Sequence, residues 1–233
     1  MSRVCVIIPA YNEAAVISDV IRDTIHELKK TTYDYEVVVV DDGSSDQTEI
    51  NAKKAGATVI RHILNSGAGG ATSTGLRYAQ TEGFEIAATM DADGQHLPSD
   101  LIKGFDMMSK REETDLLIGS RLIDSGDMTS IKRIGNKGLS LITFILFGIN
   151  STDSQSGLRL FSRRAIDQLE WRSSGYEFCS EMLWRASQLG LVIDEYPIRA
   201  VYTDYSKSKG QSNWNAVNII KSLLRRRITE MFE

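Results

Sequence analysis

Short apolar runs alternate with longer amphipathic stretches through the first half of the chain. The runs at 4–8, 35–40, 58–60 and 85–90 predict strands, and the second of them is apolar and β-branched at successive positions. A strand of that kind is covered on both faces, as in a parallel sheet. The stretches at 13–28, 46–55, 71–80 and 99–109 have apolar residues at helical spacing or helix-start and helix-stop residues at their ends. We therefore predict an α/β fold, with a Rossmann-like, mostly parallel sheet covered by helices on both faces.

The alternation breaks after the apolar run at 116–121. A polar loop at 124–129 is followed by a helical segment at 131–149 that changes from basic to apolar, and then by a polar turn at 153–157. The stretch at 214–232 places apolar residues on one helical stripe beside three arginines. No repeat or Pro-rich linker divides the chain. We expect one catalytic domain at 1–212 and a C-terminal amphipathic helix at 213–233.

Composition sets limits on the partners of the protein. With 233 residues and 42% hydrophobic content the chain can bury one sizeable core, and its net charge of −4 does not suggest nucleic acid as a partner. Its two cysteines fit reduced thiols in a cytoplasmic setting. No signal peptide is visible, and the longest apolar stretch has about half of the ~20 residues that a membrane span needs. The segments at 131–149 and 214–232 fit helices lying on a membrane surface, although the second equally fits a packing or dimer helix.

Two acidic clusters follow predicted strands. Asp91 and Asp93 come directly after the strand at 85–90, and Asp41 with Asp42 follows the strand at 35–40. Ligands of doubly wound sheets bind beyond the carboxyl ends of the strands, so both clusters are expected at one crevice. Each has a plain alternative, a solvated turn for the first and an Asx-type turn with helix capping for the second. Two carboxylates one residue apart are also a natural seat for a divalent cation and the diphosphate that it carries.

Two further segments have both a binding and a structural interpretation. The strand exit at 7–13 offers an aromatic ring and a carboxylate for a base and a ribose, or Asn12 as a helix N-cap. The glycine-rich loop at 65–71 opens a helix and fits either a phosphate cradle or tight packing. It lacks the lysine and serine ending of a P-loop.

The order of the motifs resembles glycosyltransferase family 2, and within it the polyprenyl-phosphate sugar transferases such as the dolichol-phosphate mannosyltransferases. The resemblance covers roughly residues 4–212. Its motifs are Ile-Pro-Ala-Tyr-Asn-Glu at 8–13, Asp-Asp-Gly-Ser-Ser-Asp at 41–46, Gly-Ala-Gly-Gly at 67–70, Asp-Ala-Asp-Gly-Gln-His at 91–96, Gly-Ser-Arg at 119–121 and Asp-Ser-Gln-Ser-Gly-Leu-Arg at 153–159. It implies a GT-A fold, a nucleoside-diphosphate sugar as donor, a divalent metal and inversion at the anomeric carbon.

The resemblance also implies roles for individual residues. The donor nucleotide and sugar would contact Pro9, Tyr11, Glu13, Asp41, Asp42, Asp91, Asp93 and Gln95, the metal would be held by Asp93 and Gln95, and the acceptor phosphate would meet Arg121 and Arg133. Lys137 and Lys209 are further candidates for the acceptor phosphate because of their charge, with an ordinary solvated surface as the alternative. Catalysis would depend on Asp91, Asp93 and Arg121. Two departures from the family pattern are Asn213, where a lysine is common, and Leu158 in place of phenylalanine.

The chemistry of these residue types agrees with a transfer to phosphate. The leaving diphosphate needs positive charge, and Mg²⁺ or Mn²⁺ suits carboxylate and amide oxygens. A phosphate monoester is already an anionic nucleophile and needs no strong base. A saccharide hydroxyl as acceptor would need one, and Glu181 is the candidate.

We therefore expect an inverting transferase that moves mannose or glucose from a GDP- or UDP-linked donor to a polyprenyl phosphate. It would act peripherally on the cytoplasmic face of a membrane, by itself or with a membrane-anchor subunit. The alternatives are a family 2 transferase that acts on a saccharide hydroxyl, a nucleotide-binding or nucleotidyltransferase module, and a non-catalytic subunit. The Pro-Ala-Tyr-Asn-Glu segment at 9–13 is unlike the basic glycine-rich loop of nucleotidyltransferases, and two retained aspartates argue against a non-catalytic subunit.

Overall fold

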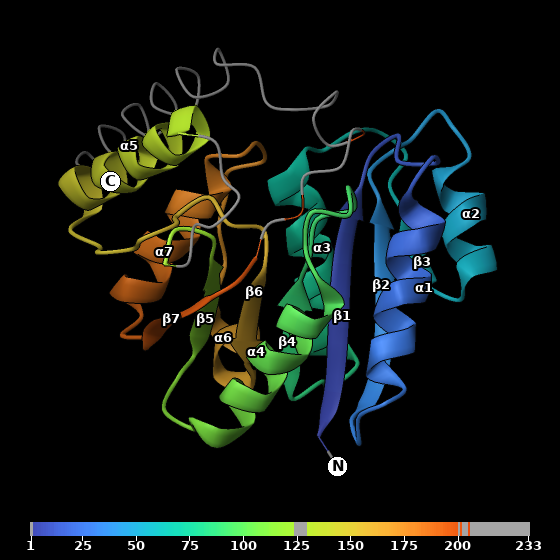
Figure 1. Ribbon diagram of the computed structural model, residues 1–233, viewed down its shortest axis with the longest axis horizontal. Coiled ribbons are helices and arrows are strands. Elements are labelled where there is room, and N and C mark those ends of the chain that lie inside the picture. The colour runs from blue at the N-terminus through green and yellow to red at the C-terminus, as the bar shows by residue number, and fades with distance from the viewer. Residues whose placement is uncertain (1, 124–129, 200, 202–204, 206–233) are drawn as a thin grey trace.

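A seven-stranded sheet forms the centre of the protein in the computed structural model, which describes residues 2–123, 130–199, 201 and 205 (Figure 1). The order of its strands is β3-β2-β1-β4-β6-β5-β7. The strands are β1 (Arg3–Ala10), β2 (Asp34–Asp41), β3 (Thr58–Arg61), β4 (Ile86–Thr89), β5 (Leu116–Ser120), β6 (Arg159–Ser162) and β7 (Ile193–Pro197). The predicted α/β architecture is confirmed.

The sheet is parallel except at one strand. β1 pairs in parallel with β2 and β4, β2 with β3, and β5 with β7. β6 runs antiparallel to both of its neighbours, β4 and β5. The beginning of β6 therefore lies at the same edge of the sheet as the ends of the other strands.

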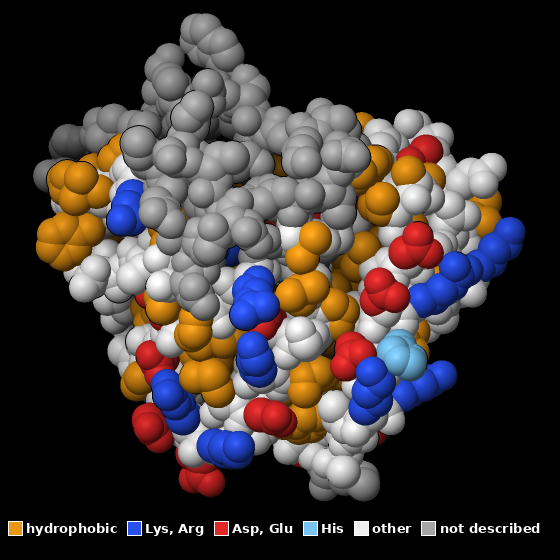
Figure 2. Space-filling model, in the orientation of Figure 1, with side chains coloured by type: hydrophobic (Ala, Val, Ile, Leu, Met, Phe, Trp, Pro, Cys, Tyr) orange, Lys and Arg blue, Asp and Glu red, His pale blue; other side chains and the backbone are white. Residues whose placement is uncertain are grey.

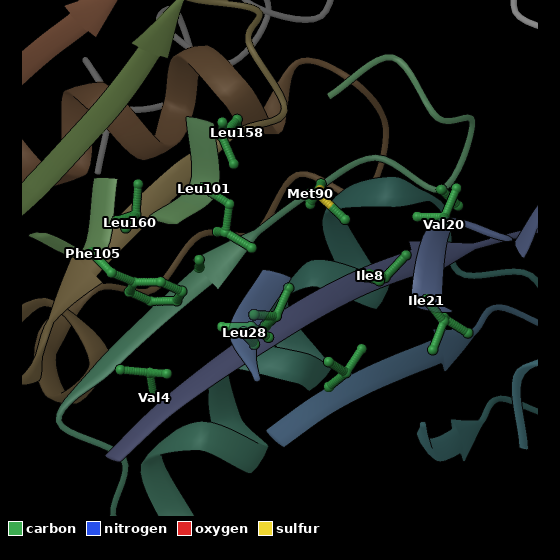
Figure 3. Packing of buried hydrophobic residues seen from close by; sticks show 14 of the residues in the cluster. Val4, Ile8, Val20, Ile21, Leu28, Met90, Leu101, Phe105, Leu158 and Leu160 are labelled. Atoms are coloured by element: carbon green, nitrogen blue, oxygen red, sulfur yellow. The ribbon is translucent and has the colours of Figure 1, made fainter. Parts of the chain in front are cut away.

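Helices cover both faces of the sheet (Figure 1). They are α1 (Ile17–Leu28), α2 (Thr48–Ala55), α3 (Ala68–Thr81), α4 (Pro98–Lys110), α5 (Ser130–Phe147), α6 (Arg163–Gln168) and α7 (Phe178–Gln188). Side chains that alternate along β1 divide between two cores. Val4 and Ile8 pack with residues of α1 and α4, as Figure 3 shows, whereas Cys5 and Ile7 pack with residues of α3, α6 and α7. Burial on both faces explains why these strands lack polar alternation.

Helix α3 lies very close to β1. A Cβ atom on Gly75 would sit 2.2 Å from the Cγ2 atom of Ile7, which is fully buried. Only glycine allows this approach, and the approach sets the depth at which α3, with the glycine-rich loop at its start, meets the sheet.

The sequence misplaces the start of one helix. Residues 13–16 were expected in α1, but the helix begins at Ile17 and Asn12 is not its N-cap. Asn12 adopts a positive φ of 55°. The backbone N–H groups of Asn12 and Glu13 donate instead to the side chains of Ser44 and Thr48. These bonds tie the chain after β1 to the chain after β2 and delay the helix.

The sequence analysis gave no elements between 158 and 199, where the structure contains β6, α6, α7 and β7. The two strands have only four and five residues, and β7 carries two acidic residues, so their apolar pattern is too short to predict them. None of the helices in the described ranges combines the length and apolarity of a membrane span. The helix predicted at 213–233 lies outside the described residues.

Helix α5 confirms the helix that the basic-to-apolar segment predicted. Its Leu141, Phe144 and Ile145 side chains are 50–69% exposed, and Figure 2 shows hydrophobic side chains gathered at the end of the molecule where α5 lies.

We expect Gly75→Ala to destabilise the protein by about 1–3 kcal/mol, because the added methyl group overpacks the contact between α3 and β1. Thermal unfolding followed by circular dichroism measures the change. Gly138→Ala in α5 is the control, since its Cβ would meet no described atom within 4 Å and alanine favours a helix. Equal melting temperatures for the Gly75 variant and the wild type would contradict the packing argument.

Candidate active site

The residues predicted to bind the donor and the metal, together with Arg121, lie at the edge where β1, β2, β4 and β5 end and β6 begins. The register pairs Ala10 with Asp41 and Ile7 with Thr89, so the two acidic clusters follow neighbours of β1 on opposite sides. Thr89 also pairs with Arg159, which brings the motif at 153–159 beside Asp91.

Asp42 organises the glycine-rich loop. Its buried carboxylate accepts hydrogen bonds from the backbone N–H groups of Ser66 and Gly67, both at 2.8 Å, and from the Ser66 hydroxyl at 2.7 Å. Nδ1 of His62 lies 2.7 Å from the same carboxylate, and its Nε2 lies 2.9 Å from the Thr74 hydroxyl. Burial tends to raise the pKa of Asp42, but the bonds from Ser66, His62 and Gly67 together hold it below its ordinary value. The charge of Asp42 therefore fixes the start of α3.

Asp41 differs from its neighbour. Its side chain is completely buried, and one carboxylate oxygen accepts the Ser44 N–H at 3.1 Å. The other oxygen, Oδ2, has no hydrogen-bond partner among the described residues and lies 3.8 Å from Nε of Arg61. A buried carboxylate oxygen without a hydrogen bond is costly, and a ligand N–H or hydroxyl would satisfy it.

Asp91 sits between a histidine and a glycine. Its Oδ2 lies 3.0 Å from Nε2 of His96, a buried residue whose Nδ1 has no hydrogen-bond partner among the described residues. On the other side, a Cβ on Gly157 would lie 2.2 and 2.3 Å from the two Asp91 oxygens. The Asp91 side chain remains about half exposed. His96 therefore holds the Asp91 carboxylate from the buried side of the site.

The pKa values of Asp91 and Asp93 shift in opposite directions. Crowding by protein atoms tends to raise the pKa of Asp91, but His96, Arg121 and Arg159 outweigh it and hold that pKa below its ordinary value. Burial raises the pKa of Asp93, and the negative charge of Asp91 raises it further. Asp93 is thus a partly buried carboxylate with a second carboxylate, Asp91, as its neighbour.

The residues around Asp93 fit a divalent cation. A carboxylate oxygen of Asp93 accepts the Gln95 N–H at 3.0 Å, and this bond closes a turn between the two residues. Carboxylate and amide oxygens suit Mg²⁺ or Mn²⁺, and a cation would offset the charge of the aspartate pair. In the described part of the chain no three His, Cys, Asp or Glu residues gather into a metal cluster. The residues present fit a metal whose shell a phosphate-bearing ligand completes.

Arg121 makes a contact that the sequence analysis did not predict. Its Nε and Nη2 donate to the two oxygens of Asp153 at 2.7 and 2.9 Å, and its backbone N–H donates to the same carboxylate. Asp153 is completely buried, so the bidentate pair fixes Arg121 at the end of β5. Lys137 is exposed on α5. The Arg133 side chain and Lys209 lie outside the described residues.

Glu181 has a structural position. It is buried in the first turn of α7, and its two oxygens accept the backbone N–H groups of Arg172 and Ser173 at 3.0 and 2.8 Å. The loop that it holds packs on the glycine-rich loop, because the Gly69 N–H donates to the Ser174 carbonyl at 2.7 Å. A Cβ on Gly67 would collide with the same carbonyl. Of the two interpretations of the glycine-rich loop, tight packing is the one that the structure contains.

The residues predicted to contact the nucleotide lie around the end of β1. Pro9 is half-buried in the strand and Tyr11 is exposed beyond it. The Glu13 carboxylate accepts the Tyr205 hydroxyl at 2.7 Å, and the Val201 N–H donates to the Gln95 carbonyl. The chain after β7 therefore returns to the site.

Sequence reasoning missed His62, Asp153 and Tyr205 as site residues. His62 and Tyr205 are single residues in segments without a recognisable pattern, and only tertiary contacts bring them to the acidic residues. Asp153 stood in a recognised motif, but nothing in the sequence indicated its pairing with Arg121.

Asp42→Asn should lower the melting temperature at pH 7 by roughly 3–8 °C, because a neutral amide replaces a charged acceptor of several hydrogen bonds. The pKa of Asp42 is lowered in the folded state, so its contribution is present above the unfolded pKa and is lost as the pH falls through the folded value. The difference between the variant and the wild type should therefore shrink below about pH 4. Differential scanning fluorimetry between pH 7 and pH 3 measures it.

The matched control is Asp19→Asn, which removes an exposed carboxylate paired with Arg22 and should change the melting temperature by only about 1–2 °C. A difference for the Asp42 variant that stays constant down to pH 3 would contradict the assigned role of its charge.

Comparisons with known proteins agree with this geometry. The family model "Glycosyl transferase family 2" matches residues 5–170. A UDP-N-acetylglucosamine–dolichyl-phosphate N-acetylglucosaminyltransferase from Methanococcus voltae is 38% identical, with 94% of this chain and 93% of that protein covered. An undecaprenyl-phosphate mannosyltransferase from Micrococcus luteus is 35% identical, with 89% and 87% covered.

Solved structures show the same fold. The crystal structure of glucosyl-3-phosphoglycerate synthase from Mycobacterium tuberculosis has a TM-score of 0.70 at 20% identity and covers 97% of this chain and 80% of its own. The same synthase in complex with Mn²⁺, UDP-glucose and phosphoglyceric acid has a TM-score of 0.68 at 20% identity, with 97% and 79% covered. The fold is the predicted GT-A fold. With the family model spanning most of the catalytic fold, this chain belongs to glycosyltransferase family 2.

Proposed function

We propose that this protein is a metal-dependent, inverting glycosyltransferase that moves a hexose from a nucleoside-diphosphate sugar to a polyprenyl phosphate. Mannose and glucose are the sugars expected from the sequence. The name of the Methanococcus relative adds N-acetylglucosamine as a third sugar to test. The two relatives described above are named for transfer to dolichyl or undecaprenyl phosphate, which supports a polyprenyl phosphate as the acceptor.

The position of Glu181 is the observation that favours a phosphate acceptor. A saccharide hydroxyl must lose its proton during transfer, and a carboxylate base serves that step. Glu181, the candidate for such a base, is only 1% exposed, and its carboxylate accepts two backbone N–H groups of the loop at 172–173. A phosphate monoester carries its negative charge into the site and needs positive charge rather than a base.

The residues at the sheet edge then have distinct roles in the proposed reaction. Asp41 and Asp42, with Pro9, Tyr11 and Glu13, form the side that receives the nucleotide. An acceptor phosphate oxygen attacks the anomeric carbon as the bond from that carbon to the diphosphate oxygen breaks, and the bonding electron pair leaves with the nucleoside diphosphate. Asp91 contacts the donor sugar, while Arg121, Arg133, Lys137 and Lys209 face the acceptor phosphate. Asp93 and Gln95 would hold a divalent cation, which would supply positive charge to the leaving diphosphate.

We also propose that the protein acts on the cytoplasmic face of a membrane and attaches through α5. A polyprenyl phosphate keeps its lipid chain in the bilayer, so the site must approach the headgroups. Leu141, Phe144 and Ile145 give α5 an exposed apolar surface, and Lys137 adds a cation that favours anionic lipid.

Transfer can be tested with radiolabelled GDP-mannose, UDP-glucose and UDP-N-acetylglucosamine. We expect one of them, with Mn²⁺ or Mg²⁺ and a polyprenyl phosphate, to give a chloroform-soluble product that mild acid cleaves, and the anomeric configuration of that product to be opposite to that of the donor. No labelled lipid from any donor would refute the lipid acceptor. A labelled saccharide whose formation is lost in Glu181→Gln would favour the hydroxyl acceptor instead.

Asp93→Ala should lower turnover by at least about 100-fold without unfolding the protein, because the leaving diphosphate loses its cation. Thermal shift with UDP and GDP, each with Mn²⁺ and with EDTA, provides a second readout. Wild-type protein should be stabilised by one diphosphate only when metal is present, and the variant by neither. Asp106→Asn on α4, whose carboxylate contacts Tyr33, is the control and should behave like the wild type. Full turnover by the Asp93 variant would rule out the metal role.

Membrane attachment can be tested by sedimentation with phosphatidylglycerol-containing vesicles. Replacement of Leu141, Phe144 and Ile145 by serine should release the protein from the vesicles, because it removes the apolar surface of α5. The control replaces Ile63 and Leu64 by serine. These residues follow β3 at the opposite end of the sheet, and they are 96% and 78% exposed (Figure 1). If the control variant left the vesicles and the α5 variant stayed bound, attachment through α5 would be wrong.

A further inference from the structure

Arg159 is a buried cation that backbone carbonyl groups surround. It begins β6 and is only 1% exposed. Its guanidinium donates to the backbone carbonyls of Ser154, Ser156 and Cys179 at 2.7, 2.9 and 3.1 Å. Among the described residues no carboxylate forms an ion pair with it. Its guanidinium also donates to the sulfur of Met182 at 3.1 Å, and Asp91 attracts its charge without a direct hydrogen bond. Burying a charge in this way is expensive, and arginine cannot avoid the cost by losing its proton.

The carbonyl groups that Arg159 binds belong to the segment that supports Asp91. Ser154 and Ser156 lie in the loop before β6. The next residue, Gly157, faces the Asp91 carboxylate, since a Cβ at this position would lie 2.2 and 2.3 Å from its two oxygens. The Gly157 carbonyl accepts the Thr89 hydroxyl at 2.8 Å, which joins the loop to the strand that carries Asp91. The position of this loop therefore limits the space that the Asp91 carboxylate can occupy.

The bond to Cys179 extends the same clamp to α7. Cys179 lies in the first turn of that helix, two residues before Glu181, which holds the loop at 172–173. One guanidinium thus connects the wall behind Asp91 with the helix that supports the glycine-rich loop. A lysine in this place could keep the charge, but a single ammonium nitrogen lacks the planar, multidentate geometry.

The positive charge of Arg159 also lies at a particular place, close to the two acidic residues of the site. Asp91 and Asp93 are both acidic, and a nucleoside diphosphate would bring more negative charge to them. A guanidinium behind Asp91 is shielded from water and ions, so its attraction is weakened little by solvent.

We propose that Arg159 is a positioning residue for the transfer reaction, which fixes the 154–157 wall against Asp91 and adds a permanent positive charge behind the donor diphosphate. This inference rests on the proposed function. It separates two effects, geometry and charge, that substitutions can distinguish.

The test compares Arg159→Lys, which keeps the charge, with Arg159→Met, which removes it. We expect the lysine variant to remain folded, to lose at least about tenfold in kcat and to keep the dissociation constant for UDP or GDP with Mn²⁺ within about twofold. The methionine variant should lose at least as much in kcat and in addition bind the diphosphate about three- to tenfold more weakly. Transfer kinetics and isothermal titration calorimetry with the full-length protein give the two readouts.

Arg164→Met is the matched control. Arg164 pairs with Asp115 and also reaches backbone carbonyls, but it lies beyond the other end of β6, away from the site. The Arg164→Met variant should be less stable than the wild type, but its kcat and its affinity for the diphosphate should be near the wild-type values. If the methionine variant at Arg159 does not fold, the lysine variant decides the geometric part by itself.

A lysine variant with kcat within about threefold of the wild type would overturn the geometric part, and equal diphosphate affinities for a folded methionine variant and the lysine variant would overturn the charge part. The proposed function fails separately, if wild-type protein binds a diphosphate with Mn²⁺ but transfers no sugar to polyprenyl phosphate. The diphosphate comparison then still tests the charge of Arg159.

Discussion

The antiparallel insertion of β6 between β4 and β5 is the constraint on which the site depends. Six strands bring their carboxyl ends to one edge, and β6 brings its amino end to that edge instead. The loop before β6 therefore joins the acidic residues that follow β1, β2 and β4. Without the reversal, residues 153–159 would lie at the opposite edge, and neither Asp153 nor Gly157 could reach its partner.

Buried charge organises this edge in two different ways. Asp42 and Asp153 are carboxylates that hold loop and side-chain donors with short hydrogen bonds. Arg159 does the reverse and gathers carbonyl oxygens around a cation. Such groups add little net stability once their desolvation is counted, but removing one partner is costly, so they specify a single arrangement. Hydrogen bonds from Arg159 hold the loop at 154–157 beside Asp91. A further bond to Cys179 connects this loop to α7 and so to the chain that packs on the glycine-rich loop.

The aspartate pair shows why the same edge is suited to a metal and a diphosphate. Asp91 has neighbouring cations and a histidine, whereas Asp93 has the charge of Asp91 beside it, and their pKa values move apart for that reason. Under the proposed function, a divalent cation beside Asp93 would offset the negative charge of the pair, and the phosphates of the donor would complete its shell.

The sequence by itself determined the alternation of strands and helices in the first half, the mostly parallel sheet and the place of both acidic clusters at strand ends. Burial on both faces leaves an apolar strand pattern, and the ends of parallel strands share an edge, so these features can be read locally. Only the tertiary structure decided that α1 starts at Ile17, that Glu181 holds a loop and that Arg121 pairs with Asp153. These outcomes depend on contacts between residues far apart in the chain, and no local pattern records which donor meets which acceptor.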